Sequence, residues 1–331
     1  MQNRLSAILL ILFISTTLNN ASAQKLVNSP FARFNLGLLE PAGSFRSMGM
    51  GGTGTAIRDN SSIYFLNPAS YSSIDTNSFV FDFGIDYGIN ILSDGSLRHF
   101  SDDINFDHIL LGFPVTKRWG IAAGIVPLSN GYYSISESVE EGDPEYNPVT
   151  GGYIETHSGE GGISHLFIGT GIRPVKNLSA GINMTLLFGS VKRINQFDFT
   201  EYSNSYNNNS TEKLQLNGIN FDYGLQYSAT IKKDYFINLG ASLSSGKEYK
   251  SRYEKISFRY NYFGTTDTIS WSADSSRVFL PGTIRMGLSF GKNNKLTAAF
   301  DYIITKWSES TLRGSEGYLG NTRSILFGVE Y

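Results

Sequence analysis

Alternation between apolar and polar residues is the feature of this chain that most restricts its fold. In the first run, residues 79–91, every odd position carries Phe, Ile or Tyr, and every even position after Val80 carries Asp, Gly or Asn. Side chains of an extended strand point alternately to opposite faces, so this run predicts a strand with one apolar and one polar face.

The same period of two returns along the rest of the chain. Nine further runs show it: residues 108–115, 119–125, 166–172, 178–188, 219–229, 237–243, 284–290, 296–304 and 324–331. After Gln24 no stretch approaches 18 consecutive apolar residues, so a membrane-spanning helix is not expected. The sequence therefore predicts an all-β chain with about ten strands.

Connection lengths indicate which kind of all-β fold this is, because a soluble β-sandwich also alternates. The connections at residues 116–118, 173–177, 232–234 and 291–295 are short, whereas those near 92–104, 136–162, 200–213, 246–275 and 308–321 are long and polar. Short turns that alternate with long loops are typical of transmembrane antiparallel up-and-down β-barrels. We expect the short turns in the periplasm, the apolar faces against lipid, and the barrel in residues 77–331.

The first residues support export across the inner membrane. Arg4 precedes an apolar run from Leu5 to Phe13, and a small-residue cleavage site, Ala21-Ser22-Ala23, follows. This three-part pattern predicts a signal peptide over residues 1–23 and, with the strands, a place in the outer membrane of a Gram-negative bacterium. A net charge of −2 argues against nucleic-acid binding. The absence of cysteine means that no disulfide holds the exported chain.

The segment between signal peptide and first strand, residues 24–76, does not alternate. It contains the glycines Gly49, Gly51, Gly52 and Gly54 and, further on, the step Asn67-Pro68-Ala69. In these motifs the sequence resembles the long-chain fatty acid transporter (FadL/TodX-like) superfamily of outer-membrane proteins, which includes PorV-like relatives. Weaker similarity in the later strands extends the resemblance over most of the mature chain.

The resemblance implies a fold and a role. In that family the segment before the first strand forms a hatch inside a 14-stranded barrel, and a hydrophobic ligand crosses the membrane through it. The glycines and Asn67, Pro68 and Ala69 would then belong to the hatch, where glycine allows close packing against the wall. By resemblance we expect passive uptake of a hydrophobic or amphipathic, fatty-acid-like small molecule, gated by the hatch. The alternative is a docking barrel that binds secreted proteins. The chain would have 14 strands if it were incomplete at its C-terminus.

Charged residues on the polar faces are expected to point into the lumen: Asp82, Asp86, Asp222, Arg285 and Asp301. They could line a substrate path, although lumen charges more often pair with one another or with a plug, because a lone buried charge is costly. Pro127 cannot donate a ladder hydrogen bond, so it predicts either a kink or the end of the third strand.

No catalytic, cofactor or metal site is expected. The four histidines, His99, His108, His157 and His165, show no metal-ligand spacing, and nothing in the sequence sets a serine or aspartate beside one of them. We expect His99 and His157 in solvated loops, and His108 and His165 toward a wet lumen. The partners implied are outer-membrane lipids and a hydrophobic small molecule.

Overall fold

The computed structural model describes residues 29–93, 95, 98–200, 205–232, 234–261, 266–312 and 318–331. The predicted signal peptide lies outside these residues. No helix among the described residues is long and apolar enough to cross a membrane.

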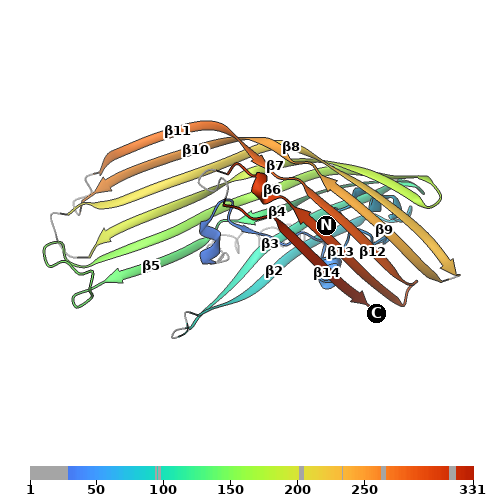
Figure 1. Ribbon diagram of the computed structural model, residues 1–331, viewed down its shortest axis with the longest axis horizontal. Coiled ribbons are helices and arrows are strands. Elements are labelled where there is room, and N and C mark those ends of the chain that lie inside the picture. The colour runs from blue at the N-terminus through green and yellow to red at the C-terminus, as the bar shows by residue number, and fades with distance from the viewer. Residues whose placement is uncertain are drawn as a thin grey trace, which may run out of the picture.

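The chain is built from strands that pair with their neighbours in antiparallel fashion (Figure 1). The long strands are β2 (Val80–Ser93), β3 (Arg98–Thr116), β4 (Trp119–Asn130), β5 (Tyr133–Val139), β6 (Tyr153–Val175), β7 (Leu178–Phe199), β8 (Asn207–Lys232), β9 (Tyr235–Ser244), β10 (Lys247–Tyr260), β11 (Thr266–Leu280), β12 (Thr283–Lys292), β13 (Leu296–Thr305) and β14 (Thr322–Glu330). The remaining elements are short: η2 (Pro30–Arg33), β1 (Leu38–Leu39), α2 (Phe45–Gly49), η3 (Pro68–Ser73) and η4 (Trp307–Glu309). The predicted all-β antiparallel architecture is confirmed.

The described residues form 14 strands in one sheet, but several of these strands continue one another. Both β4 and β5 pair with β6, and both β9 and β10 pair with β8. Strand β11 then pairs with β10, and β12 pairs with β9. Each of the couples β4–β5, β9–β10 and β11–β12 is therefore one interrupted strand. The sequence-based count of about ten matches the number of times the chain runs along the sheet.

The long polar connections between strands are shorter in the structure than the sequence predicted. Residues 153–162, 207–213 and most of 247–275 lie in strands rather than in loops. These strand ends carry polar and charged residues on both faces, which hides the period of two. Figure 1 shows the ends of β5, β6, β7, β8, β10 and β11 running well beyond the rest of the sheet, on the side away from the short turns.

One face of the sheet presents apolar side chains to the outside. Phe81, Ile85 and Ile89 of β2 are all at least 60% exposed, and the same face continues through Ile182 of β7 and Phe221 of β8. On β8 this face changes to polar residues beyond Ile219, because Asn217, Gln215 and Lys213 follow. The apolar face is therefore a band of limited height, and the extended strand ends lie outside it.

The opposite, inner face packs against residues 50–74. Seven inward glycines make this contact, and we call them the glycine belt: Gly120, Gly171, Gly181, Gly224, Gly240, Gly287 and Gly328. A Cβ atom at Gly120 would collide with the carbonyl oxygen of Tyr71, and one at Gly240 with that of Thr55. The backbone of the N-terminal segment thus reaches the sheet only because these positions lack a side chain.

Strand register brings the belt together from distant parts of the sequence. Gly120 pairs with Gly171, Gly171 with Gly181, and Gly181 with Gly224 on adjacent strands. Gly240 pairs with Gly287 further along the sheet. The glycines therefore form rows across the strands. A sheet with about ten crossings encloses a narrow space, since diameter grows with strand number, and the rows provide room for an inner segment.

The belt predicts a strong difference between two glycine substitutions. We expect Gly240→Ala to destabilise the protein by about 1–3 kcal/mol, because the added methyl group forces the Thr55 backbone away from the wall. Gly49→Ala is the matched control, since no atom lies within 4 Å of its added Cβ. Denaturant unfolding in detergent micelles measures both, and equal midpoints would contradict the close contact.

Candidate functional site

Asp301 on β13 fixes the N-terminal segment by two backbone hydrogen bonds. Its Oδ2 accepts from the amides of Gly54, at 2.8 Å, and Thr55, at 2.9 Å, and the side chain is almost fully buried. A carboxylate that accepts from two backbone amides makes charge-assisted bonds, which are stronger than neutral ones.

Asn67 joins the same segment to two further strands. Its Nδ2 donates to the carbonyl oxygens of Thr55 at 2.7 Å, Leu225 at 3.2 Å and Ala241 at 3.3 Å. Its Oδ1 accepts from the Ala69 amide and so caps η3. A fully buried amide with this many partners explains why Asn, followed by Pro at the first position of the short helix, occupies this step.

Two arginines of the segment complete the attachment. Arg46 forms ion pairs with Asp59 and with Glu330 of β14. Among the described residues, Arg58 bonds only to neutral oxygens, at Gln226 (2.8 Å), Ser179 (3.0 Å) and Ser72 (3.0 Å). Burial lowers the pKa of the Arg58 guanidinium to about 10, and the positive charge of Arg173 acts in the same direction. Arg58 stays charged at neutral pH.

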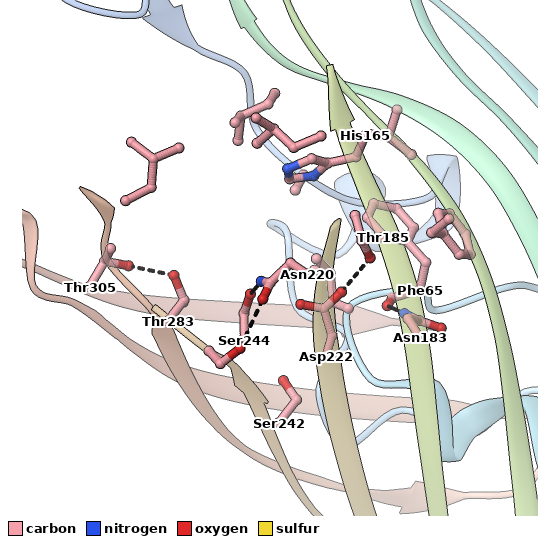
Figure 2. A pocket seen from close by; sticks show the side chains of 18 of the residues that line it. Phe65, His165, Asn183, Thr185, Asn220, Asp222, Ser242, Ser244, Thr283 and Thr305 are labelled. Atoms are coloured by element: carbon pink, nitrogen blue, oxygen red, sulfur yellow. Dashed lines mark hydrogen bonds between the residues drawn. The ribbon is translucent and has the colours of Figure 1, made fainter. Parts of the chain in front are cut away.

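A cavity of about 170 Å³ lies on the side of the glycine belt away from the short turns. Apolar side chains, including Phe65, Leu128 and Trp307, form part of its lining. The rest is polar, and Figure 2 shows Asn183, Thr185, Asn220 and Asp222 gathered there with Ser242 and Ser244. The cavity is therefore amphipathic.

Most polar groups of this cavity bond to one another. Thr185 Oγ1 donates to Asp222 Oδ2 at 2.7 Å, and Asn220 Nδ2 donates to Ser244 Oγ at 3.1 Å (Figure 2). Arg285 differs, because its buried Nε has no hydrogen-bond partner and its guanidinium forms no ion pair among the described residues. The cavity thus contains one arginine whose Nε has no bonding partner, together with the carboxylates of Asp222 and Glu40.

The wall beside this cavity is interrupted between β3 and β4. Pairing of the two strands ends at Ile109 and Ile125, and a bulge follows at Pro127 in the register of β4 with β6. The short strand β1 occupies the place that β3 leaves, with Leu38 opposite Asn130 and Leu39 opposite Ser129. Pro127 therefore lies within β4, which continues to Asn130. The chain covers the interruption with its own N-terminal segment.

The other sequence-predicted residues have different surroundings. Gly51 and Gly52 adopt positive φ angles of 67° and 81°, and Gly54 lies against Tyr64, whereas Gly49 has no close neighbour. Asp82 contacts the buried His108, which also contacts Asp107, so the His108 ring is enclosed between two partly exposed carboxylates.

Asp86, His157 and His165 complete this set. Asp86 is exposed, and its charge adds to the burial that raises the pKa of Glu40. His157 lies in β6 beside Glu155 and Asn195, so the loop expected there is wrong. His165 lines the cavity (Figure 2). The side chain of His99 lies outside the described residues.

Sequence reasoning missed the glycine belt, Arg58 and Glu40. The belt glycines appear in the sequence as ordinary members of the polar faces, and only register shows that they meet. Among the described residues no group of three or more His, Asp or Glu side chains is arranged to hold a metal ion.

Comparisons with solved structures identify the same fold. A FadL homologue from Pseudomonas aeruginosa matches with a TM-score of 0.52 at 12% identity, over 89% of this chain and 77% of that one. The toluene transporter TodX from P. putida matches with a TM-score of 0.51 at 14% identity, over 88% and 75% of the two chains. At these identities the likeness establishes the fold alone, which is the predicted antiparallel β-barrel.

Sequence comparisons supply the family. No curated protein matches the chain. The family model with the description BamG matches residues 4–331, which is nearly the entire sequence. The chain therefore belongs to the BamG family.

Proposed function

We propose that this protein is an outer-membrane β-barrel through which a small hydrophobic or amphipathic molecule passes without energy input, and that residues 29–76 act as its hatch. The amphipathic cavity between the hatch and the extended strand ends carries this proposal. The role is non-enzymatic, and the neighbours named as a FadL homologue and a toluene transporter support it.

Cavity size limits the ligand. An apolar cavity of about 150 Å³ holds benzene, whereas drug-sized ligands occupy about 300–1,000 Å³. The cavity of about 170 Å³ therefore fits a molecule the size of one aromatic ring or a short chain. A longer, fatty-acid-like molecule exceeds this volume.

Arg285 is the group of the cavity that would receive an anionic head group. Its buried Nε has no hydrogen-bond partner and it forms no ion pair among the described residues, although the charges of Asp222 and Asp301 act on it. A carboxylate placed at Arg285 would form a charge-assisted bond, with the rest of the molecule against Phe65, Leu128 and Trp307. The ligand class is thus a small amphipathic anion.

A docking barrel for secreted proteins is the second candidate. One observation favours it: on the extended ends of β10 and β11, outside the apolar band, Ile269 and Trp271 are 54% and 66% exposed beside Ile256. Exposed apolar groups in such a place are typical of protein contacts. Co-purification of a secreted protein that depends on Trp271, with cavity binding absent, would favour docking over uptake.

Removing the Asp301 carboxylate tests the hatch. Asp301→Ala leaves the Gly54 and Thr55 amides without their acceptor, at a cost of about 1–3 kcal/mol. We expect faster hydrogen exchange at these two amides and larger single-channel conductance in planar bilayers. Asp274→Ala, on an exposed strand end, is the control and should change neither. Faster exchange with unchanged conductance would mean that the segment does not close the lumen.

The role of Arg285 is tested with a charged and a neutral ligand of similar size. We expect wild type to bind benzoate more tightly than benzyl alcohol. In Arg285→Gln the ratio of the two affinities should fall by roughly tenfold or more, which is the usual effect of losing a hydrogen bond to a charged group. Calorimetry in detergent micelles measures the affinities. Arg277→Gln, which removes an exposed arginine outside the cavity, should bind as wild type does. An unchanged preference in Arg285→Gln would exclude this head-group site.

The apolar band predicts how two arginines on the same face of β8 differ. Leu225→Arg places a charge near mid-height of the band, which on β8 runs from Ile219 to Ala229, and there it should cost about 2–4 kcal/mol in a bilayer. Gln215→Arg, on the same face but above the band, should cost almost nothing. Urea unfolding in lipid bilayers compares them, and similar losses would contradict membrane contact at the assigned height. Asn183 and Asn220, which face inward, are unsuitable controls because both are buried and hydrogen-bonded.

A further inference from the structure

The short turns between strands carry an excess of positive charge. The turns β3–β4, β6–β7, β8–β9 and β12–β13 and the strand ends beside them contain seven described cations, which we call the basic collar: Lys117, Arg118, Arg173, Lys176, Lys232, Lys292 and Lys295. The only described acid in these turns is Asp234. The turns are therefore positively charged although the whole chain has a net charge of −2.

One connection at the opposite end of the molecule is acidic. The connection between β5 and β6 alone contains Glu140, Glu141, Asp143 and Glu145. The collar is also not neutralised internally, because none of its seven cations takes part in the ion pairs of the described residues. Its charge is available to a partner.

The collar is continuous along the sheet. Its four turns follow one another in strand order at a single end of the molecule. Backbone hydrogen bonds connect or flank them: the Arg173 amide donates to Arg118, the Ser228 amide to Asn177, and the Asn293 amide to Asp234, each at 2.8 Å. The cations are therefore held at one level by the sheet.

That level lies at the edge of the apolar band. Trp119 immediately follows Arg118 and is 41% exposed on the outer face. Lys292 lies over the ring of Tyr235, with 5.6 Å between its Nζ and the ring centroid. Aromatic side chains with Lys or Arg beside them are typical of the boundary between acyl chains and head groups.

We propose that the basic collar binds the phosphate groups of anionic glycerophospholipids in the leaflet at the turn end of the barrel. Charge complementarity carries this inference, together with the position of the collar at the lower limit of the band. Basic residues near an anionic lipid surface each strengthen attachment, and salt screens the effect. The inference rests on the proposed membrane location and does not involve the ligand cavity.

Two matched quadruple variants test the collar. The collar variant combines Lys117→Gln, Lys176→Gln, Lys232→Gln and Lys295→Gln, all at exposed positions. The control variant combines Lys213→Gln, Lys247→Gln, Lys250→Gln and Lys306→Gln, which removes the same charge outside the collar. Each protein is reconstituted in nanodiscs of phosphatidylcholine with or without phosphatidylglycerol, and heat-modifiable migration on gels reports folding.

Native mass spectrometry then counts the phosphatidylglycerol retained after detergent extraction. We expect the wild type and the control variant to retain this lipid. The collar variant should retain no more than roughly one third as much, because it has lost four cations near an anionic surface. Raising salt from about 0.1 M to about 1 M, which shortens the Debye length from about 10 Å to about 3 Å, should reduce retention by wild type toward that of the collar variant.

Three outcomes would overturn the inference. Equal phosphatidylglycerol retention by the collar and control variants would show that the collar does not bind lipid, and an acidic protein would then be the better candidate partner. Loss of retention in the control variant alone would show that the lipid binds outside the collar. Retention that does not respond to salt would exclude an electrostatic contact. Failure of the wild type to fold in nanodiscs would instead contradict the membrane location, and so separates the two proposals.

Discussion

Close approach of the N-terminal backbone to the glycine belt is the contact on which the rest of the structure depends. A sheet with about ten crossings encloses a narrow space, since diameter grows with strand number. Side chains at Gly181 or Gly240 would fill the space that the backbone of Pro68 and Thr55 occupies. Once the backbone lies there, its buried polar groups need partners, which Asp301 and Asn67 provide. The packing and the hydrogen bonds of the N-terminal segment thus both follow from the close approach of its backbone to the glycine belt.

The sequence predicts the strands where one face meets apolar surroundings. Residues 79–91 and 178–188 alternate because their outer side chains lie in the apolar band, and β2 and β7 cover these runs. Alternation fails at residues 266–275, since this part of β11 is exposed on both faces. Period-two reasoning detects the difference between two environments, not the strand itself.

The candidate site was only partly accessible to the same reasoning. Asp222, Arg285 and Asp301 were expected on inner faces, yet Asp301 binds the N-terminal segment while Arg285 lines the cavity. Whether an inward residue contacts the N-terminal segment or the cavity depends on the side of the glycine belt on which it lies. That position follows from register between strands far apart in sequence, such as Gly240 with Gly287, and no local pattern encodes it.

The belt also separates the two roles of the polar face. Inward polar groups at belt level, such as Gln226 and Ser289, bond to the backbone of the N-terminal segment and are therefore unavailable to a ligand. On β8, the next inward residue away from the turns is the belt glycine Gly224. Beyond it, the inward residues are Asp222 and Asn220, and both line the cavity. The height of the N-terminal segment within the sheet thus sets the floor of the cavity. If this segment is the hatch proposed above, a change that shifts it by one strand position would alter cavity size and exposed charge together, which couples closure to ligand choice.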